Sequence, residues 1–331
     1  MTATTERPAP AIPGRVFITG ANGFIGRALS ARLRDLGAEV GGVDLVADAA
    51  SGVVAGNTTD PRPWSEALTG VDTLIHTAAI VSNAAPLEQA WEVNVRGTRR
   101  VLDAAAAAGV RRFIHLSSVA AYGNDFPDKV DETYPIHVNG TSYTDTKVNS
   151  EAVVLAAHAA GEIDVTIIRP TDVVGPGSRA WVVEPLKIIK AGQMILADHG
   201  RGIFSPAYID NFVDGISLAL TADSASGQIF ILGDGYGITC ADYFGRLAAM
   251  AGGKVRSLPT SAAIALFSTL GTVQRAIGQP SELNAATVRM LNRKGTYSIE
   301  KARHTLGYEP IIDLDEGMAR TESWARAEGL L

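Results

Sequence analysis

Short apolar segments alternate with amphipathic ones over the first half of the chain. The segments at 16–19, 39–44, 53–56, 73–77, 112–117 and 165–169 are short and apolar, which predicts strands. The segments at 27–36, 64–68, 87–108 and 142–160 carry apolar positions at helical spacing, which predicts helices. Because strand and helix alternate, we expect an α/β fold with a doubly wound parallel sheet and helices on both faces.

The alternation loosens in the second half of the chain. The tripeptide Gly175-Pro176-Gly177 is a clear break, and one further core strand is predicted at 228–232. From residue 241 onward the pattern is mostly helical. We expect a smaller, mostly helical substrate lobe over the carboxyl ends of the strands, where ligands bind in open α/β sheets. The expected division is 14–174 for a nucleotide-binding domain, with 203–234 returning to it, and 175–202 with 235–331 for the substrate-binding lobe.

Composition and charge exclude several classes of protein. With 46% hydrophobic and 19% charged residues, the 331-residue chain has the make-up of a folded globular protein. A net charge of −6 without long basic runs argues against a nucleic-acid surface. The apolar run at 262–270 is too short to span a membrane, and the polar, proline-rich residues 1–13 predict a disordered lead. The single cysteine, Cys240, cannot form an internal disulfide, so we expect a reducing, cytoplasmic environment.

Three glycines lie between the first predicted strand and the first predicted helix. Gly20, Gly23 and Gly26 have the spacing G-x-x-G-x-x-G. In such a turn the first glycine permits the tight reversal, the second lets a pyrophosphate approach the backbone, and the third lets helix and strand pack closely. The helix that follows would present free N–H groups to the phosphates. The segment therefore predicts a dinucleotide site.

Asp44 closes the second predicted strand, at 39–44. A carboxylate in this position accepts hydrogen bonds from both hydroxyls of the adenosine ribose and repels a 2′-phosphate. The residue therefore favours NAD over NADP.

Tyr143 and Lys147 open the predicted helix at 142–160 and share one of its faces, one turn apart. A neighbouring ammonium favours the phenolate and lowers the pKa of a tyrosine, which can then exchange a proton near neutral pH. Ser118 follows the fifth predicted strand. Its hydroxyl and the Tyr143 phenol are candidates to bind one substrate oxygen, which polarises a carbonyl for hydride attack.

These motifs, in this order, resemble those of the extended branch of the short-chain dehydrogenase/reductase superfamily, which includes NAD-dependent epimerases and dehydratases. The resemblance covers residues 15–310 and implies a Rossmann-type sheet. The matching segments are 19–26 for the cofactor loop, 76–79, 94–98, the trio Ser118, Tyr143 and Lys147, and the segments 169–170, 175–177, 208–211 and 298–310.

The resemblance implies a mechanism and a set of cofactor contacts. Tyr143 would be the general acid/base, Lys147 would lower its pKa and hold the nicotinamide ribose, and Ser118 would orient the substrate oxygen. Hydride would pass between the substrate carbon and NAD, and no metal is expected. The implied NAD contacts are Gly20, Asn22, Gly23, Phe24, Ile25, Gly26, Asp44, Asn57, Thr58, Thr77, Ala78, Ala79, Ser117, Tyr143, Lys147, Pro170 and Val173.

Three nearby residues need separate interpretation. Asn57 stands where the family usually has an aspartate that accepts a hydrogen bond from adenine, and an asparagine can still accept one through its carbonyl oxygen. His76 ends a predicted strand, and we expect it to be structural and not to transfer protons. We expect Asn94 to tie its helix to the neighbouring strand.

Three positions indicate the substrate class. Among the relatives that act on nucleotide sugars, the dehydratases carry an Asp-Glu pair after the serine. Enzymes of nucleotide sugars also usually have an asparagine and an arginine at the two positions that contact the diphosphate. This chain has Val119-Ala120, Asp172 and Phe204 instead. A carboxylate facing a diphosphate is unfavourable, and a phenylalanine cannot pair with one. The chain looks most like the 3β-hydroxysteroid dehydrogenase-like group, which also includes reductases of β-keto acids, so the implied substrate is a lipophilic alcohol or ketone.

Alternatives stay open. An NAD-dependent nucleotide-sugar epimerase is disfavoured by those diphosphate positions, and a cofactor-sensing regulator is disfavoured because the serine, tyrosine and lysine are all retained. Arg179 and Arg201 remain available for a carboxylate or phosphate on the substrate. Related proteins pair through two long helices, which implies a homodimer through the predicted helices 87–108 and 142–160.

Overall fold

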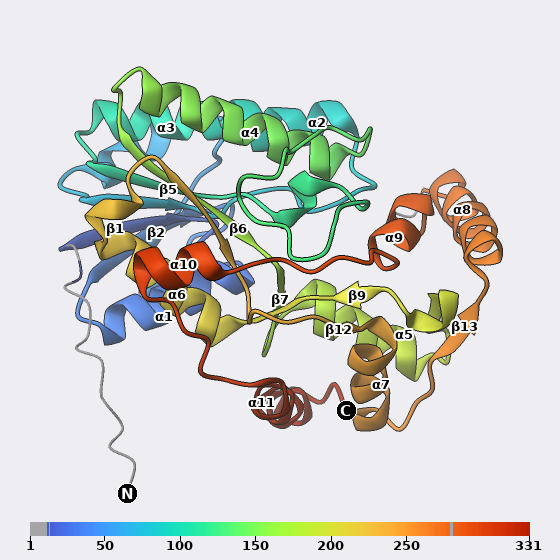
Figure 1. Ribbon diagram of the computed structural model, residues 1–331. Coiled ribbons are helices and arrows are strands. Elements are labelled where there is room, and N and C mark those ends of the chain that lie inside the picture. The colour runs from blue at the N-terminus through green and yellow to red at the C-terminus, as the bar shows by residue number, and fades with distance from the viewer. Residues whose placement is uncertain (1–11, 13, 279–280) are drawn as a thin grey trace, which may run out of the picture.

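The computed structural model describes residues 12, 14–278 and 281–331, and it shows a central sheet with a lobe at one end (Figure 1). The lead expected at 1–13 lies outside the described residues except for Ile12, which packs against the core.

The central sheet has seven parallel strands in the order β11-β6-β5-β4-β1-β2-β3. The strands are β1 (Arg15–Thr19), β2 (Glu39–Asp44), β3 (Val53–Ala55), β4 (Thr73–His76), β5 (Arg112–Leu116), β6 (Asp164–Pro170) and β11 (Gln228–Leu232). This confirms the predicted doubly wound sheet. The strand order reverses between β1 and β4, where Thr19 lies between Val43 and His76. Such a reversal leaves a crevice at the carboxyl ends of the strands, where ligands bind.

Helices cover both faces of the sheet (Figure 1). α1 (Phe24–Asp35), α6 (Ile209–Thr221) and α10 (Glu300–Leu306) lie on one face, and α2 (Leu87–Trp91), α3 (Thr98–Ala107) and α4 (Ser142–Ala159) lie on the other. The segment predicted as one helix at 87–108 is helical, but a π-helical turn, Glu92–Gly97, separates α2 from α3. The helix predicted at 64–68 is a 3₁₀ helix, Arg62–Leu68, with a proline at its start.

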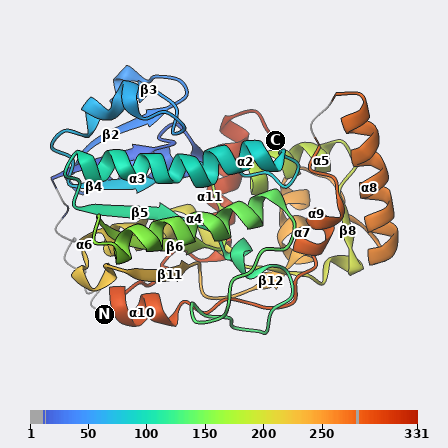
Figure 2. The same cartoon turned by 90° about the horizontal axis from the view of Figure 1, so that it is seen from above.

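The C-terminal lobe lies beyond the carboxyl ends of the strands, as the view from above shows (Figure 2). Its helices are α5 (Glu184–Lys190), α7 (Cys240–Met250), α8 (Thr260–Ala276), α9 (Ala285–Met290) and α11 (Leu314–Ala327). Three two-stranded sheets accompany them: β7 (Asp172–Val174) with β10 (Pro206–Tyr208), β9 (Ile203–Phe204) with β12 (Ile238–Thr239), and β8 (Ile195–Ala197) with β13 (Arg256–Leu258). These strands are too short to show an alternating pattern in the sequence, which predicted only helices and loops there.

The sheet is buried on both faces. Val16 and Ile18 of β1 point into one core and Phe17 points into the other, as the two-residue period of a strand requires. Both cores are apolar, which is typical of parallel sheets covered by helices. The first core continues into the lobe, where the ring of Phe204 stacks on Tyr243 with centroids 3.9 Å apart. The lobe therefore packs against the sheet as part of one core.

Among the helices of residues 12, 14–278 and 281–331, none has the length and apolar character that crossing a membrane requires.

Candidate active site

The glycine turn joins β1 to α1 and has room for a ligand against its backbone. Gly20 has a φ of +69°, and its N–H donates to Val43 O at 2.9 Å. A Cβ at Gly26 would lie 2.3 Å from Gly20 O, so only glycine allows this packing. Gly23 precedes the first turn of α1, which has no side-chain cap and no acidic residue. Its free N–H groups and positive dipole end fit a pyrophosphate, and Asn22, Phe24 and Ile25 belong to the same turn.

Asp44 lies at the end of β2, against this turn. One carboxylate oxygen accepts the N–H of Asn22 at 2.9 Å, and the other accepts the N–H of Leu45 at 2.7 Å. A carboxylate offers about four lone-pair sites, so acceptor capacity remains for the ribose hydroxyls of NAD. Asp44 therefore shapes the turn and keeps acceptor capacity that a cofactor could use.

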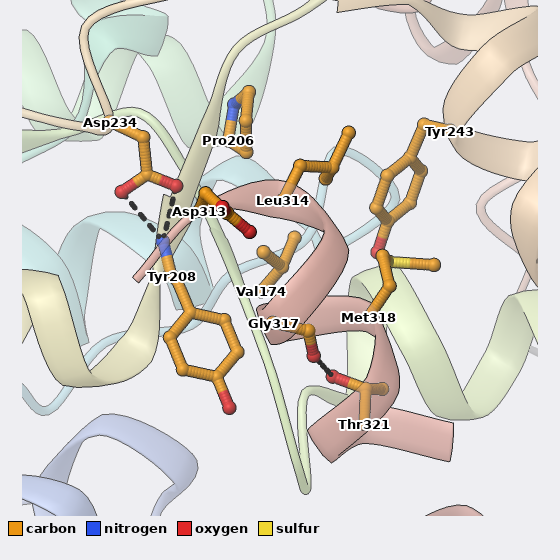
Figure 3. Close-up of a pocket in the computed structure, with 10 residues that line it drawn as sticks. All are labelled: Val174, Pro206, Tyr208, Asp234, Tyr243, Asp313, Leu314, Gly317, Met318 and Thr321. Atoms are coloured by element: carbon orange, nitrogen blue, oxygen red, sulfur yellow. Dashed lines mark hydrogen bonds between the residues drawn. The ribbon is translucent and has the colours of Figure 1, made fainter. Parts of the chain in front are cut away.

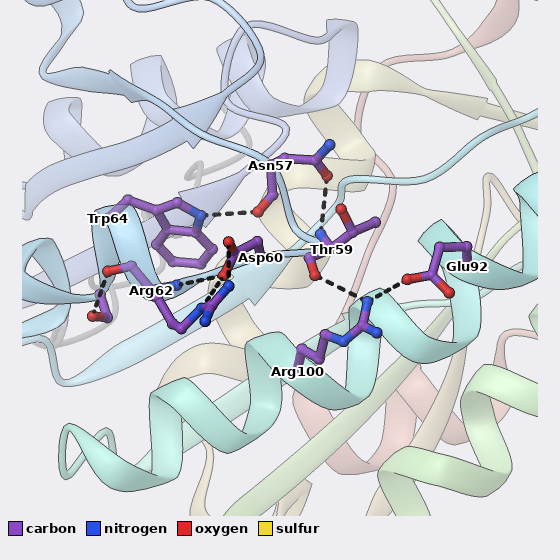
Figure 4. Close-up of polar contacts among 8 residues, drawn as sticks. Asn57, Thr59, Asp60, Arg62, Trp64, Glu92 and Arg100 are labelled. Carbon is purple, nitrogen blue, oxygen red and sulfur yellow. Dashed lines mark hydrogen bonds and ion pairs between the residues drawn. The ribbon is translucent and has the colours of Figure 1, made fainter.

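The loop after β3 is held by polar contacts (Figure 4). The side-chain oxygen of Asn57 accepts the N–H of Thr59 at 2.9 Å, and its main-chain oxygen accepts Nε1 of Trp64 at 3.0 Å. Arg100 of α3 donates to Thr59 O at 2.9 Å, and Thr58 is buried. The carboxamide oxygen expected to face adenine is thus already engaged in a local turn, with one lone pair left.

The segment after β4 runs beside β1. Thr77 Oγ1 donates to Thr19 O at 2.7 Å, and the N–H of Ala78 donates to Thr19 Oγ1 at 3.3 Å, so Thr77, Ala78 and Ala79 lie next to the glycine turn. The ring of His76 is bonded to Thr19 Oγ1 at 2.8 Å and to Thr98 Oγ1 at 3.1 Å. Burial lowers the pKa of His76 to about 3, so the ring is neutral and has a structural role.

Asn94 ties the π-helical turn to its surroundings. Its side chain accepts the N–H of Ile80 at 2.7 Å and donates to Ile80 O at 3.0 Å, and it also donates to Thr146 Oγ1 at 3.0 Å. It therefore joins α2–α3, the segment after β4 and α4. The π-helical turn Glu92–Gly97 therefore lies where these three elements meet.

Ser118, Tyr143 and Lys147 come together at the carboxyl edge of β5. Ser118 caps the 3₁₀ helix Val119–Tyr122, and its Oγ accepts the N–H of Ala120 at 3.1 Å. The Ser118 side chain lies near enough to the phenol of Tyr143 to influence the pKa of that phenol. Lys147 Nζ lies 5.9 Å from the centroid of the Tyr143 ring and donates to Leu116 O at 2.7 Å.

Burial has the largest influence on the pKa values of Tyr143 and Lys147. Burial raises the pKa of Tyr143 above its ordinary value, and the interaction with the Ser118 side chain opposes this rise. The net rise differs from the lowering that the sequence predicted from the neighbouring Lys147. The lysine points at Leu116 O and not at the phenol. Burial also lowers the pKa of Lys147 to about 8, against the attraction of Glu151. At neutral pH the ammonium form of Lys147 therefore still predominates.

Sequence reasoning missed Glu151 and noted Arg169 only as part of the matching segment 169–170. Glu151 lies one turn beyond Lys147 on α4, and Arg169 of β6 makes an ion pair with it at 2.7 Å, both side chains being buried. The spacing from Lys147 to Glu151 was the available signal, since it repeats the four-residue step from Tyr143. Ser117, expected to contact NAD, donates its hydroxyl to Glu151.

The segment 170–177 brings the lobe toward the glycine turn. Pro170 ends β6, and Val173 is buried in β7. A Cβ at Gly177, whose φ is +88°, would lie 3.6 Å from the ring of Phe24. This segment therefore passes directly over the start of α1.

The diphosphate positions are filled from within the protein. The Asp172 carboxylate accepts the N–H of Ser205 at 3.0 Å and makes a buried ion pair with Arg293. The argument from its repulsion of a diphosphate is therefore wrong as stated, because Arg293 neutralises the charge. Phe204 is fully buried between Trp181 and Tyr243.

The two arginines considered for a substrate anion both have partners on the surface. Arg179 pairs with Glu184 at 3.4 Å, and Arg201 pairs with Asp198. Arg201 lowers the pKa of Asp198 to about 2.

A small pocket lies against α11 (Figure 3). Val174, Tyr208 and Met318 are among its lining residues, and Asp234 holds the N–H of Tyr208 at its edge, at 3.0 and 3.1 Å. None of the expected NAD contacts and none of the trio Ser118, Tyr143 and Lys147 lines it. Within the part of the chain that the structure describes, no group of three His, Cys, Asp or Glu residues is placed to hold a metal ion.

Comparison with known proteins agrees with this geometry. A 3-beta-hydroxysteroid dehydrogenase of Mycolicibacterium neoaurum is 29% identical, covering 92% of this chain and 90% of that protein. A 4-hydroxy-2-methyl-3-oxo-4-farnesyl-3,4-dihydroquinoline-1-oxide ketoreductase of Stigmatella aurantiaca is also 29% identical, covering 92% of this chain and 94% of that protein. The crystal structure of a short-chain dehydrogenase/reductase superfamily protein from Agrobacterium tumefaciens with bound NAD has a TM-score of 0.75 at 26% identity, over 95% of this chain and 98% of that chain.

The family model described as the NAD dependent epimerase/dehydratase family matches residues 16–233, the part of the chain that holds the glycine turn, Asp44 and the trio at β5. The chain therefore belongs to the NAD dependent epimerase/dehydratase family, and it is an NAD-dependent oxidoreductase.

Proposed function

We propose that this protein interconverts a secondary alcohol and a ketone on a lipophilic substrate, with Ser118, Tyr143 and Lys147 as its catalytic residues. The observation that carries the proposal is that the Ser118 side chain and the Tyr143 phenol meet at the carboxyl edge of β5, with Lys147 one turn further along α4. Two hydroxyl groups that meet there can bind the same substrate oxygen.

In this mechanism the chain moves a proton and positions the reacting oxygen. In the reducing direction Tyr143 donates its phenol proton to the substrate oxygen while Ser118 donates a second hydrogen bond, and in the oxidising direction the phenolate takes the proton back. The Lys147 ammonium favours the phenolate through its charge and is the residue that would bind the nicotinamide ribose. NAD, when bound, supplies the hydride acceptor. The glycine turn and Asp44 are the residues that would hold its pyrophosphate and adenosine ribose.

A lipophilic substrate is supported by the composition of the diphosphate positions. The Arg293 guanidinium next to Asp172 is already paired with that carboxylate, and Phe204 is a buried aromatic side chain, so neither position offers a diphosphate an uncommitted cation. The names of the two relatives, a hydroxysteroid dehydrogenase and a farnesyl-quinoline ketoreductase, indicate lipophilic substrates for those two proteins. We assign substrate binding to the lobe formed by 175–202 and 235–331.

We further propose a homodimer through α2, α3 and α4. These helices lie side by side on one face of the sheet (Figures 1 and 2), and α3 is rich in alanine, which permits close approach of a second copy. The oligomeric state in solution tests this proposal.

The substrate class is tested by incubating the purified protein with NAD and a panel of 3β-hydroxysteroids, β-hydroxy acids and UDP-sugars. Reduced nicotinamide is followed by absorbance, and sugar products are separated by chromatography. Formation of NADH with a lipophilic alcohol supports the proposal. An epimerised UDP-sugar without net NADH would overturn it in favour of a nucleotide-sugar epimerase.

A further inference from the structure

A buried ion pair lies next to Lys147, and the mechanism above does not use it. Glu151 and Arg169 are both buried. The guanidinium donates twice to the carboxylate, from Nε to Oε1 at 2.9 Å and from Nη2 to Oε2 at 2.7 Å, and Ser117 Oγ donates to Oε1 as well. Buried charges are very unfavourable unless paired and hydrogen-bonded, so each of these residues stabilises the charge of the other.

The pair anchors the backbone on both sides of Ser118. On one side, Ser117 bonds to Glu151 through its hydroxyl, and its N–H donates to Ile168 O at 2.8 Å. On the other side, the short helix that Ser118 caps ends at Tyr122, whose phenol oxygen accepts Nη1 of Arg169 at 2.6 Å. The segment 117–122 is therefore held at both ends by one ion pair, which fixes where the Ser118 hydroxyl lies.

The pair also sets the charge around Lys147. The titratable and charged groups packed near this lysine are Tyr143 and Glu151 on α4, His115 on β5, His76 on β4 and Arg169 on β6. Burial lowers the pKa of both histidines well below 7, so they are neutral, and burial keeps Tyr143 protonated. Glu151 is thus the one anion in this set. Without it, two cations would share a buried region.

We propose that Glu151, held by Arg169, is a positioning residue that keeps Lys147 in its ammonium form and fixes the segment carrying Ser118. This role rests on the proposed function, because it gives Lys147 and Ser118 their importance. If Glu151 became neutral, Lys147 would lose its proton more readily than the guanidinium of Arg169 would, since arginine is effectively always charged. The phenolate of Tyr143 would then lose its nearby cation.

The test titrates Lys147 directly in the full-length protein. The chain has seven lysines, so labelling lysine with ¹³C at the ε-carbon gives few signals, and Lys147→Met identifies the relevant one. We expect Glu151→Gln to lower the titration midpoint of Lys147 by about one pH unit or more. The matched control is Glu162→Gln, which neutralises a carboxylate on the surface that pairs with Arg99 at 2.5 Å and should leave the midpoint unchanged.

Two further variants separate charge from shape. Glu151→Asp keeps the anion, so its midpoint should stay closer to native than that of Glu151→Gln. The double variant Glu151→Gln/Arg169→Met removes both charges, and its midpoint should lie below native but above that of the single variant. If Glu151→Gln folds, a native titration midpoint of Lys147 in that variant overturns the proposal. If Glu151→Gln does not fold, a native midpoint in the double variant overturns it.

The readout needs no substrate, so it is independent of the proposed function. If a lipophilic alcohol is turned over, the acid limb of its oxidation by Glu151→Gln should move to higher pH, because the phenol of Tyr143 would need a higher pH to ionise. A uniform loss of rate with an unmoved pH profile and a native Lys147 midpoint would show a merely structural role and overturn the proposal. Absence of turnover with a shifted midpoint would count against the proposed function alone.

Discussion

The nucleotide-binding half of the molecule and its C-terminal lobe are organised differently. In the first, the polar residues of the site lie close to element boundaries: Asp44 closes β2, Ser118 lies two residues after β5, and Tyr143 and Lys147 lie near the start of α4. In the lobe and its junction, the important contacts join distant parts of the chain: Asp172 pairs with Arg293, which is 121 residues away. The proposed catalytic residues thus lie at the boundaries of single elements, and the lobe proposed to bind substrate depends on long-range packing. A change of substrate class in the lobe need not disturb the catalytic edge.

The largest expected effect is a loss of turnover when one tyrosine is replaced by phenylalanine in the nucleotide-binding half. The same replacement in the lobe, made as a separate variant, is the comparison. Tyr143→Phe removes the proposed proton donor, and we expect about a 1,000-fold loss of kcat with unchanged NAD affinity. Tyr243→Phe removes a phenol in the lobe that donates to Trp181 O at 2.9 Å, and we expect about 1 kcal/mol less stability with turnover retained. Steady-state kinetics and thermal unfolding measure both. Equal losses of turnover in the two variants would contradict the division of roles.

The buried ion pair at the junction should matter for stability and not for NAD. Asp172→Ala leaves the Arg293 guanidinium buried without its partner, which should lower the free energy of unfolding by about 3–5 kcal/mol. Replacing both residues, as in Asp172→Leu/Arg293→Met, should recover much of that loss. Denaturant unfolding and NAD titration provide the measurements. A single variant with native stability would show that the pair contributes nothing.

A glycine-to-alanine pair compares the two halves at the level of backbone packing. Gly26→Ala places a Cβ 2.3 Å from Gly20 O, so the glycine turn must shift, with an expected loss of about 1–3 kcal/mol and weaker NAD binding. At Gly245 in α7, an added Cβ meets nothing within 4 Å, so Gly245→Ala should be neutral or stabilise the helix by up to about 1 kcal/mol. Calorimetry of NAD binding and thermal unfolding distinguish these outcomes, and native NAD affinity in Gly26→Ala would argue against a pyrophosphate at this turn.

The smallest expected effect concerns the choice between NAD and NADP. Asp44→Asn removes the charge that repels a 2′-phosphate, so the preference for NAD should fall by about tenfold. Asp48→Asn is the control, because Asp48 follows β2 but bonds to Ser51 Oγ at 2.7 Å. Dissociation constants for both cofactors report the preference. A native protein that already prefers NADP would show that Asp44 has been misinterpreted.

The sequence predicted the sheet and its candidate site far better than the lobe. The glycine turn, Asp44, Ser118, Tyr143 and Lys147 could be identified because each lies at a fixed offset from a strand or helix boundary. Residues such as Arg293 could not, because no local pattern shows which arginine will meet Asp172 across the fold. The direction of the pKa shift of Tyr143 was also missed, because the sequence shows the neighbouring lysine but not the burial of the phenol.

The most direct test of the account follows the hydride itself. NADH carrying deuterium at both C4 positions of the nicotinamide is incubated with the ketones of the alcohols in the substrate panel, and the products are analysed by mass spectrometry. The account predicts that one deuterium appears on the new carbinol carbon of a lipophilic product, and that Tyr143→Phe transfers it about 1,000-fold more slowly. Deuterium transfer at the native rate in Tyr143→Phe, or no transfer to any ketone while a UDP-sugar is epimerised, would contradict it.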